Sequence, residues 1–152
     1  MISIQVRGDR VLIDDLGDMA SQAPAALRKG LRRIAEGAHR HAFDWLSGAG
    51  AQASGVAAGG YPVPVRTGHL RRSLDFIGPG ETRAAGGEVW RTGDLEAVLF
   101  DSAAYSGAIH DGTGSSRKFG PRAFLVDGVE SFDRAEGIVA VLEDELDRSL
   151  KG

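Results

Sequence analysis

Apolar and polar residues alternate over residues 2–7, with isoleucine or valine at every second position. This spacing predicts a strand with one buried face. Gly8 and Asp9 then predict a tight turn, with Val11–Ile13 as the hairpin partner of that strand. Glycine and proline turns bound three later apolar runs, which predict further strands. These runs are Leu74–Ile77, Glu88–Arg91 and Ala97–Asp101.

A helical spacing of apolar residues, every three or four positions, extends from Ser21 to Leu46. Ser21 is the expected N-cap of this long helix, and Pro24 fits because proline is tolerated in a first turn. Gly30 and Gly37 weaken the helix by up to ~1 kcal/mol each relative to alanine, unless they permit close packing against a neighbour.

A second long helix is predicted at the end of the chain, beginning between Phe124 and Gly128 and ending near Leu150. Its apolar stripe consists of Val129, Phe132, Ala135, Val139, Leu142, Leu146 and Leu150. Between the two helices, Ala103–His110 is expected to form one short helical turn.

The order of strand, helix, loop, several strands and helix predicts an α+β fold. We expect a mainly antiparallel sheet, with the long N-terminal helix and the C-terminal helix packed on one face. A chain of 152 residues fits a single domain over 1–152. Residues 47–64 are rich in glycine and alanine, which predicts a long flexible loop within this domain.

Composition and charge narrow the class of protein. Hydrophobic content is 42% and charged content 26%, as in ordinary globular domains. The net charge of −3 gives no global attraction to DNA or to anionic lipid. The sequence has no cysteine, no secretory signal pattern and no apolar run of the roughly 20 residues that a membrane span needs. We expect a soluble protein, made in the cytoplasm, that has no membrane contact.

The residues that bear reactive groups do not form a recognised catalytic, metal or cofactor pattern. His39 and His41 are two apart on a helix, whereas helical metal pairs are three or four apart. Residues 112–117 lack the Gly-Lys-Ser/Thr ending of a phosphate loop. We expect no enzyme, metal or cofactor. The rival is a small hydrolase built on His110 and Asp111, although no nucleophile elbow accompanies them.

The two long helices carry opposite charges. The first has one basic face, and the last is acidic. The basic residues are Arg28, Lys29, Arg32, Arg33 and Arg40. We expect the basic face of one subunit to meet the acidic helix of its neighbour, head to tail. Reversing the charge of Arg32 and Arg33 is then expected to disrupt assembly and leave the monomer folded.

The alternative function is a nucleic-acid-binding module that uses the basic face of the first helix. Its phosphate contacts would be Arg28, Lys29, Arg32, Arg33, Arg71 and Arg72. No aromatic residues interleave with this basic face, and no recognised nucleic-acid motif surrounds it.

Three segments share a pattern with a known family. They are Val65–Leu74 (VRTGHLRRSL), Tyr105–Thr113 (YSGAIHDGT) and Gly120–Leu125 (GPRAFL). In this order, over about residues 20–150, they resemble the tail-component family of long-tailed bacteriophages, described as tail-completion, neck or head–tail joining proteins. Ser106 stands where the family usually has alanine, and His110 where it usually has glutamate.

This resemblance implies a structural protein of the virion, located at the head–tail junction and made in the cytoplasm of the host bacterium. It also implies a homo-oligomeric ring, for which six-fold symmetry is favoured and twelve-fold symmetry is the alternative. The ring would contact adjacent neck, connector or tail-tube proteins, and DNA would pass through it without sequence specificity. Gly48–Pro64 and Asp111–Gly120 are expected to be the contact loops.

Two sets of residues are singled out. The expected subunit or partner contacts are Arg28, Arg32, Arg33, Arg71, Arg72, Arg117, Lys118, Glu143 and Asp147. The expected scaffold residues of the family motifs are Thr67, Gly68, Leu70, Tyr105, Gly112, Thr113, Pro121 and Phe124. Thr67 and Gly68 would cap and start a short turn. Tyr105 and Ile109, four apart, would both pack inward, and Phe124 would anchor the last helix.

Overall fold

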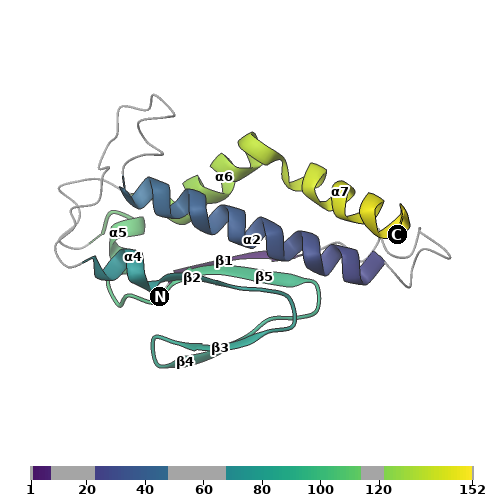
Figure 1. Ribbon diagram of the computed structural model, residues 1–152. Helices are drawn as coiled ribbons and strands as arrows, with labels where there is room; N and C mark the ends of the chain where they lie inside the picture. Colours follow the sequence, from purple (N-terminus) through teal and green to yellow (C-terminus); the bar gives the residue numbers. More distant parts are fainter. Residues whose placement is uncertain (1, 8–22, 48–67, 114–121, 152) are drawn as a thin grey trace.

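The computed structural model describes residues 2–7, 23–47, 68–113 and 122–151 (Figure 1). The helices are α2 (Ala23–Ser47), α4 (His69–Ser73), α5 (Ser106–His110), α6 (Phe124–Glu136) and α7 (Ile138–Lys151). The strands are β1 (Ile2–Arg7), β2 (Leu74–Ile77), β3 (Thr82–Ala85), β4 (Glu88–Arg91) and β5 (Glu96–Asp101). Among these residues no helix is long and apolar enough to span a bilayer.

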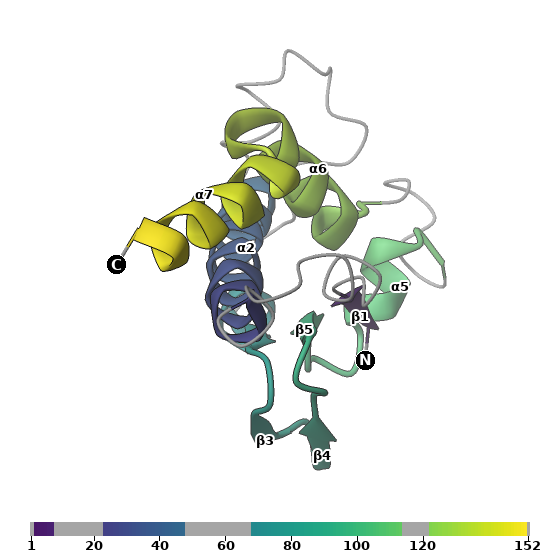
Figure 2. The ribbon, with the colours of Figure 1, turned by 90° about the vertical axis from the view of Figure 1, so that its right-hand side faces the viewer.

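The central sheet has the order β1–β5–β2 and is antiparallel throughout. Its middle strand is buried from Ala97 to Asp101 because both faces of the sheet are covered. Leu99 lies in the core on the α2 side, while Val98 and Phe100 form a second cluster. That cluster is covered by the β3–β4 hairpin, whose Trp90 ring stacks on Phe100 at 5.8 Å. Figure 2 shows this hairpin on the side of the sheet away from α6 and α7.

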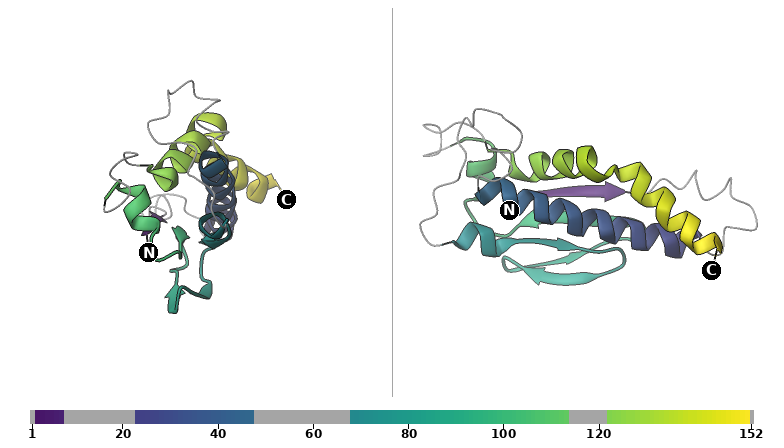
Figure 3. Two further views of the ribbon diagram at one scale, coloured as in Figure 1. Left: turned by 90° about the vertical axis from the view of Figure 1, so that its left-hand side faces the viewer. Right: turned by 45° about the horizontal axis from the view of Figure 1, so that its top comes forward.

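Small residues let α6 and α7 lie close along α2 (Figure 3). A Cβ on Gly37 would be 2.2 Å from the Phe132 ring, and a Cβ on Gly30 would be 2.7 Å from Leu142. The prediction that these two glycines permit close packing is therefore confirmed. Their partners, Phe132 and Leu142, belong to α6 and α7 respectively.

The predicted α+β fold is confirmed, with helices on one face of an antiparallel sheet. The strands Leu74–Ile77 and Glu88–Arg91 have their predicted bounds, and β5 begins one residue earlier than predicted. β3 was not predicted. The predicted N-cap Ser21, the hairpin partner Val11–Ile13 and the loop at 47–64 beyond Ser47 lie outside the described residues.

The prediction of one C-terminal helix is wrong, because Gly137 divides it into α6 and α7. Gly137 has a φ of +75°, which a residue with a side chain rarely adopts. The Asp133 carboxylate accepts a hydrogen bond from the Ile138 N–H at 2.8 Å and so caps the start of α7. The break changes the buried face: Val139 is 66% exposed, whereas Val141 is buried.

Candidate functional site

The described parts of the three motif segments, distant in sequence, converge at one end of the molecule, which we call the motif end (Figure 1). It consists of α4, α5 and residues 122–124. The Arg122 N–H donates to the carbonyls of Ile109 and His110 at 3.2 and 3.1 Å. The Ser102 N–H donates to the Ser73 carbonyl at 3.1 Å. The first pair of bonds joins the third segment to the second, and the last bond joins the first segment to the residue after β5. The rings of His69 and Tyr105, 6.1 Å apart, bring the first segment against the second.

A buried carboxylate, Asp101 at the end of β5, connects the motif end to the sheet. Its side chain is fully buried. Its Oδ1 accepts hydrogen bonds from Ser73 Oγ at 2.9 Å and from the Ala103 N–H at 2.8 Å. Ser106 Oγ donates to the Asp101 carbonyl at 3.2 Å. Burial raises the pKa of the Asp101 carboxyl, and the hydrogen bonds from Ala103 and Ser73 oppose that shift. Asp101 therefore ties α4 and α5 to β5.

Stability is expected to depend on pH through Asp101. Because its pKa is raised by folding, the folded chain holds the proton more tightly than the unfolded chain. The free energy of unfolding should therefore fall as pH rises from about 4, the ordinary carboxyl pKa, through the folded pKa. Urea denaturation of Asp101→Asn across this range should lose that slope. The exposed carboxylate variant Asp44→Asn is the control, and parallel curves for Asp101→Asn and wild type would contradict the prediction.

Several motif residues have the structural positions expected of scaffold. Leu70 and Phe124 are buried in the core. Gly68, the N-cap of α4, has a φ of +67°, and Gly112 has a φ of +66°, both in the left-handed region that favours glycine. The Thr113 N–H donates to the Ala108 carbonyl at 2.9 Å. The predicted scaffold residues Thr67 and Pro121 lie outside the described residues.

Tyr105 does not pack inward as predicted, since it is 43% exposed. It is the N-cap of α5, outside the helix, so it does not share a helical face with Ile109. Its ring lies 6.1 Å from the ring of His69 on α4. Ile109 does pack against the core.

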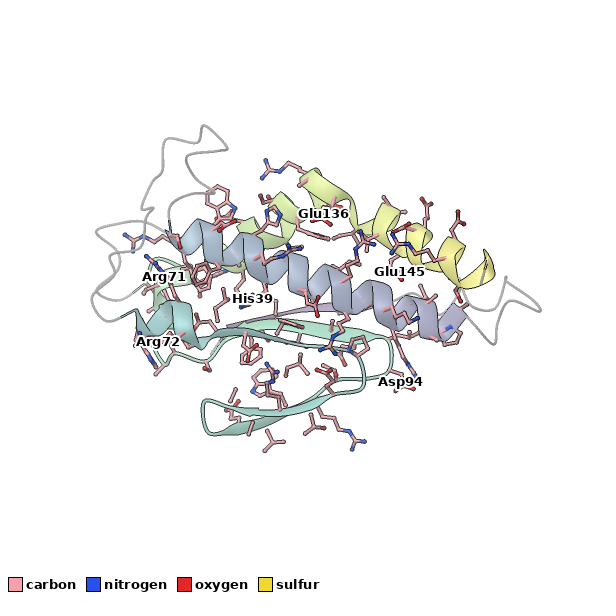
Figure 4. All side chains as sticks on the ribbon, viewed as in Figure 1. His39, Arg71, Arg72, Asp94, Glu136 and Glu145 are labelled. Carbon is pink, nitrogen blue, oxygen red and sulfur yellow. The ribbon has the colours of Figure 1, made fainter. Side chains whose placement is uncertain are left out.

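The arginines on the basic face of α2 form ion pairs within the same chain. Arg28 pairs with Asp94 at 2.6 Å. Arg32 pairs with Glu36 at 3.2 Å and also with Glu81. The remaining pairs are Arg33 with Asp144 at 2.7 Å, Arg33 with Glu145 at 3.3 Å, and Arg40 with Glu136 at 4.0 Å. Figure 4 shows Asp94, Glu136 and Glu145 on the elements that flank α2.

The acidic partners of α2 therefore include residues of its own α6 and α7. The hydrogen bond to Asp144 raises the pKa of Arg33, and the bond from Arg32 lowers the pKa of Glu81. The two oppositely charged helices, which we expected to meet between subunits, meet within one chain. Charge reversal at Arg33 consequently acts first on the fold of the monomer.

Arg33→Glu is expected to lower the melting temperature by a few degrees, because the new carboxylate faces Asp144 and Glu145. Combining it with Asp144→Arg should recover part of the loss. Lys29→Glu, an exposed cation on the same helix, is the control and should change the melting temperature little. Thermal unfolding followed by circular dichroism measures all four proteins. Equal effects of Arg33→Glu and Lys29→Glu would show that the ion pairs are unimportant.

The histidines point in different directions, as their spacing predicted. His39 Nε2 lies 3.2 Å from the Leu74 carbonyl, toward the sheet, and His41 Nδ1 lies 3.0 Å from Ser131 Oγ on α6. No group of three potential metal ligands occurs in the described part of the chain.

His110 Nδ1 lies 2.9 Å from Asp111 Oδ1, and its Nε2 is buried with no hydrogen-bond partner in the described ranges. The hydroxyls of Ser102 and Ser106 donate instead to main-chain carbonyls. The rival hydrolase would need a serine hydroxyl directed at the His110 imidazole. The Asp111 carboxylate orients that imidazole, but the hydroxyls of these two serines are directed at main-chain carbonyls.

The other expected contact residues lie toward opposite ends of the molecule. Arg71 and Arg72 belong to α4 at the motif end (Figure 4). Glu143 and Asp147 are exposed on α7. Arg117 and Lys118 lie outside the described residues. Asp101 was not among the residues predicted from the sequence. The signal for it was an acidic residue directly after a wholly apolar run.

Comparisons with family models, with curated proteins and with solved structures found no match for this chain.

Proposed function

We propose that this chain is a structural component of a tailed-bacteriophage virion and a subunit of a homo-oligomeric ring at the head–tail interface. The observation that carries the proposal is the convergence of the three family-like segments at the motif end. Hydrogen bonds join Arg122 to Ile109 and His110, and the buried Asp101 accepts hydrogen bonds from Ser73 and Ser106. Segments that lie between residues 65 and 125 of the sequence are thus adjacent in space in their described parts.

The chemistry of the motif end fits a structural role. Its buried members, Leu70 and Phe124, fill the core, and Gly68 and Gly112 have backbone angles that favour glycine. Its exposed members, Arg72 and Tyr105, remain available for protein contacts. Tyrosine and arginine are enriched in protein interfaces. A ring subunit needs a rigid unit of this kind to hold contact residues in register.

The rival function, nucleic-acid binding by the basic face of α2, has less support. Arg28, Arg32 and Arg33 would have to exchange carboxylates of their own chain for phosphate groups. Such binding would have to compensate for the lost ion pairs.

The proposed function is tested in a phage whose genome carries this gene. A stop codon within the gene should give DNA-filled heads and separate tails in electron micrographs, with few joined particles. A wild-type copy supplied in trans should restore joining, and a labelled antibody should decorate the junction. Normal yields of infectious particles without the protein would overturn the proposal.

A further inference from the structure

Two cations at the motif end are not used by the ion pairs of α2. Arg72 is exposed, and the half-buried Arg71 lies beside it on α4. The Arg71 guanidinium lies 5.9 Å from the centroid of the Phe43 ring, and its Nε is buried with no hydrogen-bond partner among the described residues. Figure 4 shows both arginines at the same end of the molecule.

Exposed aromatic rings accompany these cations. Phe43, at the C-terminal end of α2, is 39% exposed, and Tyr105 is 43% exposed. Arg71 contacts the first ring, and His69 of the same helix lies beside the second. We call Phe43, Arg71, Arg72 and Tyr105 the basic end. The pairing of an arginine with an aromatic ring, as in Arg71 with Phe43, is typical of energetically important interface positions, in which tyrosine is also enriched.

The complementary surface is on α7. Val139, Glu143 and Asp147 are four residues apart, so they form one row along the helix. All three are exposed, Val139 to 66%. The side of α7 that faces α2 is different and carries Leu142, which packs on Gly30. We call Val139, Glu143 and Asp147 the acidic row. Since α7 runs away from the motif end, the row lies toward the opposite end (Figure 1).

We propose that the basic end of one copy binds the acidic row of a second copy of this chain. The basic end combines two positive charges with two exposed aromatic rings, and the acidic row combines two negative charges with the exposed Val139. Because the two surfaces differ and lie toward opposite ends, the contact is head to tail, and its repetition gives a ring or a filament. The inference rests on the proposed function and names the subunit contact, which uses α4 and α7 rather than the internally paired face of α2.

Charge exchange tests the contact. The variant Arg71→Glu/Arg72→Glu should associate about tenfold or more weakly than wild type, because its acidic end meets an acidic row. The variant Glu143→Lys/Asp147→Lys should fail likewise, because both of its surfaces are basic. An equimolar mixture should recover the wild-type mass, since every contact between the two variants joins opposite charges. Sedimentation velocity measures the mass, and urea denaturation checks that each variant folds.

Two further measurements control this experiment. Glu88→Lys/Arg91→Glu exchanges exposed charges on the β4 strand and should leave the mass unchanged. The chain has no cysteine, so introduced thiols are unique. A mixture of Tyr105→Cys and Val139→Cys chains should form disulfide-linked dimers on oxidation, whereas Val89→Cys with Val139→Cys should not.

Several results would overturn the inference. The first is a wild type that stays monomeric at every concentration. The second is a wild-type mass for either double variant on its own. The third is an equimolar mixture of the two double variants that stays monomeric. Loss of duplex-DNA binding by Arg71→Glu/Arg72→Glu with unchanged mass would assign the basic end to DNA instead. The stop-codon experiment decides the proposed function separately, because it measures the joining of heads and tails whichever surface connects the subunits.

Discussion

Gly128→Ala is expected to lower the free energy of unfolding by about 2–3 kcal/mol, although alanine is the better helix former. An added Cβ would lie 2.6 Å from the Cβ of Ala42, 2.7 Å from its main-chain nitrogen and 2.8 Å from its Cα. Two of these atoms are backbone, so no rotamer change can relieve the overlap. Helices α2 and α6 would have to separate, which would also loosen the packing of Phe132 on Gly37.

Gly107→Ala is the matched control, because Gly107 is also helical but a Cβ added there would meet no neighbouring atom within 4 Å in the described part of the chain. This change should leave stability unchanged or raise it by up to ~1 kcal/mol. Gly37→Ala should fall between the two variants, since the overlapping atoms belong to the Phe132 side chain. Urea denaturation with an unchanged m value measures all three. Equal shifts for Gly128→Ala and Gly107→Ala would contradict the packing argument.

The apolar pattern predicted the elements that bury a regular face or a continuous apolar run. The long helix α2 has the first kind of pattern and the strand β5 the second, and both follow it closely. β3 has no such pattern, because its residues from Thr82 to Ala84 are exposed. Its signal was the Gly86–Gly87 pair, since two glycines with positive φ form a two-residue hairpin turn. That pair, together with Glu88–Arg91, could have located the missing strand.

The break at Gly137 could not be predicted from the apolar pattern. A single glycine within a helical run costs only about 1 kcal/mol, so its presence is compatible with a continuous helix. Asp133 contributes the decisive interaction, because its carboxylate caps Ile138 where α7 begins. Such a cap depends on a backbone turn that the residue spacing does not specify.

The candidate site, like the fold, could be predicted from the sequence only in part. The motif residues Leu70 and Phe124 were correctly expected to be buried. The sequence also showed one basic and one acidic helix, but charge alone does not state whether they meet within a chain or between chains. The contact of Arg33 with Asp144 and Glu145 answers this for the folded monomer. For this reason the subunit contact that we propose uses α4 and α7 and leaves the internally paired face of α2 out.

Phe124→Ala should have the largest effect, a loss of about 3–5 kcal/mol in the free energy of unfolding. Phe124 is fully buried in the first turn of α6, and its ring meets His110 edge to face at 5.6 Å. Its removal leaves a cavity between the last helices and the motif end. Since domains of this size are stable by about 5–15 kcal/mol, the loss is a large part of the total.

The loss of the Phe124 ring should also destabilise one neighbouring helix, α5, more than the rest of the core. The Arg122 N–H bonds to Ile109 and His110 sit beside the ring, so amide hydrogen exchange in α5 should accelerate more than in β5. Val126→Ala, an exposed change in the same helix, is the control and should cost well under 1 kcal/mol. Phe124→Leu should retain most of the stability because it fills part of the cavity. Equal exchange in α5 and β5 would show that Phe124 supports the whole core and has no special role at the motif end.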